Sequence, residues 1–166
     1  MNYFFNFEKL SYVKKKRNNE CILCLIIGQS KDVPDLTIFR STSFIISVNL
    51  YPYNPGHLLI FPKRHIEDIR NYTEKEELEL AKLIKTFLDI LDDLHNPSGY
   101  NIGYNMGLVA GASINHLHLH IIPRYPSETG IADLIAGKRV LVENPFETAE
   151  KIKQRIAQSP RSIFEI

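Results

Sequence analysis

The sequence predicts an α+β domain in which one long helix packs on an antiparallel sheet and a second helix follows near the C-terminus. Short strand-like runs lie on both sides of one long stretch of helical periodicity, which is the order expected of an α+β domain. A chain of 166 residues with 44% hydrophobic content suffices for one core, and no Gly/Ser/Pro-rich tract divides it. We therefore expect a single domain over residues 1–166, with an N-terminal extension (1–20), a core (21–124) and a C-terminal segment and helix (125–166).

Three candidate strands precede the long helix. Thr37–Arg40 and Phe44–Val48 are short runs of strand-forming residues joined by a polar turn, and a third run covers residues 56–61 between Pro55 and Pro62. Proline cannot donate a ladder hydrogen bond, so we expect the third strand to end before Pro62.

The long helix is the most clearly marked element. Thr73 followed by Glu76 has the spacing of a capping box, and apolar residues from Leu80 to Leu94 then recur at helical intervals. Asn96 and the proline after it predict the end of this helix.

Two further strands and a closing helix are expected after the long helix. Residues 100–105 and 117–122 have strand-like patterns and are joined by a glycine-containing loop, and Pro145–Gln158 has a helical pattern.

Charge and hydropathy exclude some classes of protein. The net charge of +1 gives no support to nonspecific nucleic-acid binding, and the longest apolar stretches, residues 21–27 and Phe44–Val48, are too short to span a bilayer. The first 16 residues do not have the pattern of a signal peptide. We therefore expect a cytoplasmic protein with no nucleic-acid or membrane partner.

Half of the six histidines stand at every second position in one run, as His116, His118 and His120. Alternation with Leu117 and Leu119 is strand periodicity, so the imidazoles would point to one face, each roughly 7 Å from the next. Histidine acts as a metal ligand, as a general acid or base, or as a nucleophile toward phosphorus. The plainer alternative is a solvated strand face.

The loop before the histidines contains two glycines and a hydroxyl, at Gly107, Gly111 and Ser113. Backbone N–H groups in such a loop can approach an anion closely, and Ser113 can donate to it. Beside three aligned imidazoles, this loop suggests a phosphate site, although a glycine pair before a strand is more often only a turn.

The run from His116 to Ile122 resembles the signature of the histidine triad family of nucleotide hydrolases and transferases. Four other segments resemble a branch that includes bacterial and archaeal proteins similar to diadenosine tetraphosphate hydrolases and phosphorylases, namely residues 51–58, 62–65, 101–107 and 110–113. The resemblance runs from about Cys21 to the C-terminal helix, and it implies the fold described above and a homodimer.

The resemblance implies a mechanism. His118 would attack the α-phosphorus of a nucleotide in line and form a nucleotidyl-histidine intermediate, while its other ring nitrogen donates to a backbone carbonyl. His120 would contact the phosphate and the leaving group, and His57 would support the active histidines. The substrate would be a dinucleoside polyphosphate or another adenylylated compound.

The resemblance also assigns substrate contacts. Asn49 matches a position that binds ribose hydroxyls, Asn105 and Ser113 match positions that contact phosphate oxygens, and Gly111 belongs to the same phosphate loop. For Asn49 the alternative is a turn residue at a strand end, and for His57 a buried core histidine.

Cys21 and Cys24 have the two-residue spacing of a zinc knuckle, which is half of a tetrahedral site. Zinc-bearing members of the family use the histidine of the 62–65 segment and the first triad histidine, so the resemblance adds His65 and His116. With four protein ligands the zinc would be structural. Buried apolar cysteines are the alternative, whereas a redox motif lacks its usual βαβ context here.

Some positions depart from the branch pattern and leave functions open. Ala112 stands where many triad hydrolases have glutamine, and the 110–116 loop is one residue shorter than in the phosphorylase-like branch, so the acceptor can be water or phosphate. Two other functions are a hydrolase in which His116 and His118 bind a catalytic zinc, and a nucleotide-binding regulatory protein without activity.

Overall fold

Five antiparallel strands form one sheet in the computed structural model, which describes residues 20–126 and 143–160. The strand order is β1-β2-β3-β5-β4. The strands are β1 (Thr37–Arg40), β2 (Phe44–Val48), β3 (Leu58–Pro62), β4 (Gly99–Tyr104) and β5 (Leu119–Arg124). The α+β arrangement with an antiparallel sheet is as predicted. The expected N-terminal extension and much of the expected C-terminal segment lie outside the described residues.

Three α-helices and two short 3₁₀ turns accompany the sheet in the described ranges. They are α2 (Ile22–Ile27), η1 (Ile69–Asn71), α3 (Glu74–His95), η2 (Leu108–Ala110) and α5 (Pro145–Gln158). The predicted capping box forms at Thr73 and Glu76, and α3 ends at Asn96 in the left-handed conformation, with φ 44°. The α5 bounds are those predicted. Helix α2 was not predicted, because six residues are too few to display a helical period.

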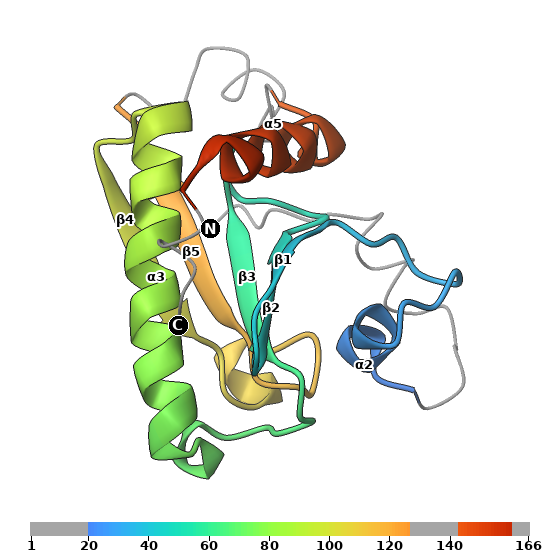
Figure 1. The fold of residues 1–166 in the computed structure, drawn as a ribbon. Coiled ribbons are helices and arrows are strands. Elements are labelled where there is room, and N and C mark those ends of the chain that lie inside the picture. The colour runs from blue at the N-terminus through green and yellow to red at the C-terminus, as the bar shows by residue number, and fades with distance from the viewer. Residues whose placement is uncertain (1–19, 127–142, 161–166) are drawn as a thin grey trace, which may run out of the picture.

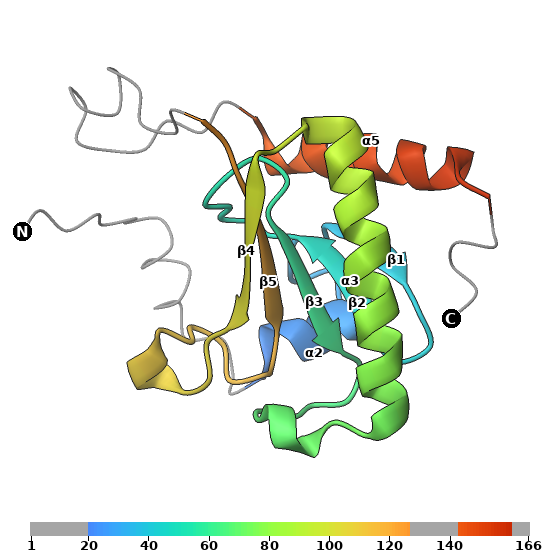
Figure 2. The same ribbon diagram turned by 90° about the vertical axis from the view of Figure 1, so that its left-hand side faces the viewer.

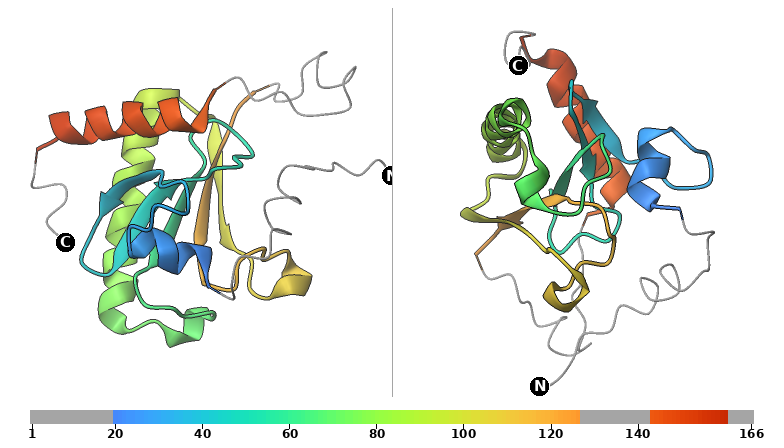
Figure 3. Two further views of the ribbon diagram at one scale, coloured as in Figure 1. Left: turned by 90° about the vertical axis from the view of Figure 1, so that its right-hand side faces the viewer. Right: turned by 90° about the horizontal axis from the view of Figure 1, so that it is seen from below.

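The helices α2 and α3 lie against opposite faces of the sheet (Figure 3, right). The strand side chains explain this, since they alternate between two apolar clusters. Phe44 and Ile46 belong to the larger cluster, which includes buried residues of α3 and α5. Ile45 and Phe61 belong to a smaller cluster with Leu23 of α2. The central strands β2 and β3 are therefore buried on both faces.

Strand β5 lies between β3 and β4, and it presents His120 toward α2. Leu119 and Ile121 pack in the larger cluster on the α3 face, so His120 between them points to the other face. Helix α2 and the turn η2 lie toward one end of the sheet, and α5 crosses the opposite end (Figures 1 and 2). A strand, a helix and a loop thus surround one region of the α2 face.

The predicted start of β5 at residue 117 is wrong by two residues, so His116 and His118 precede the strand. Strand β5 pairs with β3 and with β4 only from Leu119 onward, although β3 itself continues for two residues beyond Ile60, its last residue in that pairing. The N–H of Leu117 donates instead to the carbonyl of Ile66, at 2.6 Å. Pro62 itself is the last residue of β3 rather than the residue after it.

None of the helices in the described ranges combines the length and the apolar character that crossing a bilayer requires.

Candidate active site

The ring of His118 is held by the backbone of the residue two positions before it. His118 is only 4% exposed, and its Nδ1 lies 2.7 Å from the carbonyl oxygen of His116. A carbonyl oxygen can only accept a hydrogen bond, so Nδ1 carries the proton and Nε2 carries the in-plane lone pair. This is the tautomer that a histidine nucleophile requires, and the backbone contact is the one that the resemblance implied.

A second pair of histidines has its protons placed by the same argument. The N–H of Tyr53 donates to Nδ1 of His57 at 3.1 Å, so His57 carries its proton on Nε2. That nitrogen lies 3.0 Å from Nδ1 of His120, which therefore accepts. In the neutral ring, the proton of His120 is then on Nε2. The ring centroids of His118 and His120 are 4.9 Å apart, and both side chains line the cavity described below.

His57 is fully buried behind His120 and does not line the cavity described next. Its partners are the Tyr53 backbone, the amide nitrogen of Asn49 at 3.3 Å and His120. His57 is therefore a buried histidine with hydrogen-bond partners, as the alternative expected, and one of those partners is the triad histidine His120.

A cavity of about 190 Å³ lies on the α2 face of the sheet beside the histidines. Its polar lining includes a residue that follows β2, residues of the chain between β4 and β5, and one residue of β5, namely Asn49, Asn105, Gly111, Ser113, His118 and His120. Its apolar lining comes mainly from α2, β3 and the chain before β1, including Ile22, Leu23, Ile26, Leu36, Leu59 and Phe61. An apolar wall beside polar donors and imidazoles suits a flat base joined to a phosphate.

The loop before the histidines differs from the expected backbone cradle. The N–H groups of Ala110 and Ala112 both donate to the carbonyl of Gly107, and that of Gly111 donates to Leu108. These three amides hold the loop in shape, with Gly111 at φ +91°, where a side chain would be strained. The polar side chains of this loop that line the cavity are the amide of Asn105 and the hydroxyl of Ser113.

Asn49 combines the two interpretations that the sequence left open. Its Oδ1 accepts from the backbone N–H of Tyr51 at 3.1 Å, which is the contact of an Asx turn at the end of β2. Its side chain also lines the cavity and directs Nδ2 toward His57. Asn49 therefore makes a turn contact and also lies at the cavity.

The four predicted metal ligands lie together, at the edge of the α2 face. One ligand atom from each of Cys21, Cys24, His65 and His116 falls within 4.8 Å of the others. Nδ1 of His116 is 3.5 Å from Sγ of Cys21 and 3.6 Å from Sγ of Cys24, and Nδ1 of His65 is 3.3 Å from Sγ of Cys24. Tetrahedral zinc, with bonds of about 2.3 Å to sulfur and about 2.0 Å to nitrogen, needs sulfur–nitrogen separations of roughly 3.5 Å. The donor set and its spacing therefore fit zinc.

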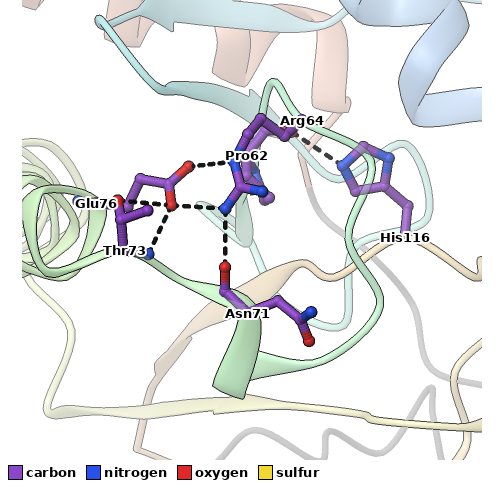
Figure 4. Close-up of polar contacts among 6 residues, drawn as sticks. All are labelled: Pro62, Arg64, Asn71, Thr73, Glu76 and His116. Carbon is purple, nitrogen blue, oxygen red and sulfur yellow. Dashed lines mark hydrogen bonds and ion pairs between the residues drawn. The ribbon is translucent and has the colours of Figure 1, made fainter.

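The contacts around His116 orient its ring for this cluster. Nε2 donates to the carbonyl oxygen of Pro62 at 2.9 Å (Figure 4). This contact leaves Nδ1 to face the sulfurs of Cys21 and Cys24. Burial lowers the pKa of His116 and so favours the neutral ring that a metal binds. Burial and the neighbouring Cys21 raise the pKa of the Cys24 thiol to about 11, so a metal would have to displace its proton.

Comparison with known proteins decides the family. The family model described as the HIT domain matches residues 30–127, more than half of the chain. The chain belongs to the histidine triad family. This histidine triad protein is 31% identical over 135 residues to an AP-4-A phosphorylase of Mycobacterium tuberculosis, covering 81% of this chain and 69% of that one. It is 33% identical over 97 residues to an asymmetrical bis(5'-nucleosyl)-tetraphosphatase of Schizosaccharomyces pombe, covering 58% and 53% of the two chains.

A solved structure shares the fold of this histidine triad protein. The Zn-bound histidine triad family protein of Mycobacterium smegmatis superimposes with a TM-score of 0.65 at 25% identity, over 84% of this chain and 94% of the other. The predictions of the family, of the fold and of an enzyme are confirmed by these comparisons.

Sequence reasoning missed one wall of the cavity in this histidine triad protein. Ile22, Leu23 and Ile26 reach the cavity from α2, and Tyr53 lines it while stacking on His57 with ring centroids 5.3 Å apart. The apolar run at residues 21–27 was the available signal, but only the fold places it opposite the histidines.

Proposed function

We propose that this protein is a nucleotide hydrolase or nucleotidyltransferase that acts at the α-phosphate of dinucleoside polyphosphates or other adenylylated compounds. The observation that carries the proposal is the 2.7 Å contact between Nδ1 of His118 and the His116 carbonyl, in a cavity with apolar and polar walls. The enzymes named among the relatives support the same class of substrate.

In the proposed reaction, Nε2 of His118 attacks the α-phosphorus and forms a phosphorus–nitrogen bond. The bond from phosphorus to the leaving oxygen breaks, and Nε2–H of His120 donates its proton to that oxygen. Water or inorganic phosphate then attacks the adenylylated His118 and gives its proton back to His120. The products from diadenosine tetraphosphate are AMP and ATP with water, or ADP and ATP with phosphate.

The remaining cavity residues have proposed roles in binding and charge stabilisation. Asn105 and Ser113 donate to the phosphate oxygens, where negative charge is concentrated during phosphoryl transfer. Gly111 allows the loop to approach the phosphate closely, and Asn49 binds the ribose. The apolar residues of α2 and β3 take the base. His57 holds His120 in the tautomer that donates.

We propose that Cys21, Cys24, His65 and His116 bind a structural zinc ion. The spacing of their ligand atoms supports this, and so does the Zn-bound relative. A bound zinc would supply a cross-link between α2, the chain after β3 and the histidine run. The alternative of a catalytic zinc on His116 and His118 is less well supported, because Nδ1 of His118 bonds to a backbone carbonyl and His65 completes the cluster.

We also propose a homodimer of a single-domain protein. Strand β4 is at the edge of the sheet and exposes Asn101, Ile102 and Gly103, and a second copy would cover the apolar Ile102. Analytical ultracentrifugation tests this proposal, and a monomer at micromolar concentration would contradict it. A cytoplasmic location and the absence of nucleic-acid and membrane partners stay predictions.

The decisive experiment incubates the protein with diadenosine tetraphosphate, with and without inorganic phosphate, and identifies the products. Mass spectrometry of acid-free quenched samples should find AMP on His118. ADP formed only with phosphate indicates a phosphorylase, and AMP formed in both cases indicates a hydrolase. Nucleotide binding without turnover would reject the enzymatic proposal and favour a regulatory protein.

A further inference from the structure

The backbone that holds the histidine run comes from residues 62–66, which are the last residue of β3 and the irregular segment after it. The carbonyl of Pro62 accepts from Nε2 of His116, and the carbonyl of Ile66 accepts from the N–H of Leu117. Between these two, His65 faces Cys24. The 62–66 segment therefore touches the metal cluster and the two residues immediately before His118.

Regular secondary structure does not fix residues 63–66, so their position depends on other contacts. The N–H of Lys63 donates to the carbonyl of Ser43 at 2.7 Å. The Nζ of Lys63 donates to the carbonyl of Ser41. Arg64 connects the segment to the first turn of α3, since its Nε and one terminal nitrogen each lie 2.8 Å from an oxygen of Glu76 (Figure 4). The same terminal nitrogen donates to the carbonyl of Asn71 at 2.8 Å.

Glu76 is well suited to act as a fixed anchor. It is 6% exposed, and it also accepts from the N–H and hydroxyl of Thr73 in the capping box. The side chain of Arg64 is half exposed, so an ordinary salt bridge there would contribute little to stability. Two parallel hydrogen bonds to a buried carboxylate do, however, fix the orientation of the Arg64 side chain, because the planar guanidinium matches the carboxylate in one orientation.

We propose that Arg64 and Glu76 are positioning residues, which hold the 62–66 segment and through it the ring of His116 and the nucleophile His118. This inference rests on the proposed function of His118. Neither residue lines the cavity, so they act on the reaction only through the segment. Small displacements of a nucleophile reduce rate far more than they reduce binding.

Arg64→Met and Glu76→Gln test the inference separately and together. Glu76→Gln keeps an acceptor for Thr73, since glutamine also forms capping boxes, but it removes the charge that Arg64 pairs with. Arg70→Met is the matched control, because Arg70 makes the same two-pronged contact with Asp68, at 2.9 and 2.6 Å, on the neighbouring turn η1.

We expect each single variant to lower kcat for diadenosine tetraphosphate by on the order of tenfold, with KM changed by less than about threefold, and the double variant to be no worse than either single. The Nδ1–H resonance of His118 in nitrogen-15 histidine spectra should shift in both variants, and a chelator should remove metal faster. Arg70→Met should match wild type in all three measurements.

Unchanged kcat and an unshifted His118 resonance would overturn the inference, as would equal losses in Arg70→Met. If Arg64→Met does not fold, Arg64→Lys is tested in its place, because lysine keeps the positive charge but cannot make the two parallel hydrogen bonds of the guanidinium. If the wild-type protein does not turn over the substrate, the proposed function fails, and the His118 resonance alone then decides the inference.

Discussion

The carbonyl oxygen of His116 lies 2.7 Å from Nδ1 of His118, while Nδ1 of His116 lies 3.5 Å from Sγ of Cys21. One residue thus belongs to the proposed metal centre through its ring and holds the proposed nucleophile through its backbone. A metal there would stabilise the position of His118 without touching the substrate.

Replacement of the metal should therefore have little effect on the rate. We expect protein reconstituted with cadmium to keep kcat within about threefold of the zinc form, because a structural site needs only the tetrahedral geometry that both ions accept. Turnover of diadenosine tetraphosphate, with metal content measured in parallel, checks this. A loss of rate that follows the identity of the ion would instead indicate a catalytic metal.

Cys21→Ser should remove one sulfur ligand and lower both metal content and stability. We expect a decrease in Tm of roughly 4–8 °C, which corresponds to about 2 kcal/mol for a chain of this size. Elemental analysis and thermal unfolding measure the two effects. Equal zinc in the variant and the wild type would show that Cys21 is not a ligand.

His118→Ala should abolish turnover while leaving the fold intact. The imidazole supplies the only proposed covalent bond to phosphorus, so we expect kcat to fall by about a thousandfold or more. Circular dichroism and the affinity for AMP serve as controls, and both should stay near the wild-type values. Retention of more than a few per cent of the rate would exclude His118 as the nucleophile.

Ile22→Phe should narrow the cavity at its apolar wall. Ile22 is in the first turn of α2, where it is only partly buried, so a larger ring is expected to enter the cavity without disturbing the core. We expect KM for adenosine substrates to rise by about tenfold, equivalent to about 1.4 kcal/mol of binding. Leu78→Phe on α3 is the control, because Leu78 is 68% exposed and does not line the cavity. The same KM in both variants would contradict the assigned base site.

Acid should weaken the fold through Glu76. The hydrogen bond from Arg64 lowers the pKa of Glu76 from 4.5 to about 2, so its carboxylate stabilises the folded state above pH 4.5. That contribution is lost as the pH falls from 4.5 toward 2. Because Arg64 is half exposed, we expect a loss on the order of 1–2 kcal/mol. Urea unfolding across this range should show a weaker pH dependence in Glu76→Gln, and an identical dependence would reject this origin.

The sequence by itself determined the elements whose causes are local. Strands β1 and β2, the capped helix α3 and helix α5 agree with their predicted bounds, because caps and hydrophobic periods act between residues close in the chain. The alternation predicted one strand face for His116, His118 and His120; only His120 lies in β5, and His118 and His120 line the cavity whereas His116 does not. The residue types for a zinc site were also recognisable, although His65 and His116 were assigned from the family resemblance.

Only the tertiary structure decided how distant segments meet. Helix α2 forms from an apolar run that is too short to show a helical period in the sequence. The fold places this helix and His118 around the same cavity. It brought His65 to within 3.3 Å of Cys24, 41 residues away in the chain. It also ended the pairing of β5 with both neighbouring strands at Leu119, so that His116 lies before the strand, with Nδ1 of its ring 3.5 Å from Sγ of Cys21. These features depend on the register of the sheet and on backbone contacts of loops, which side-chain patterns along one segment do not record.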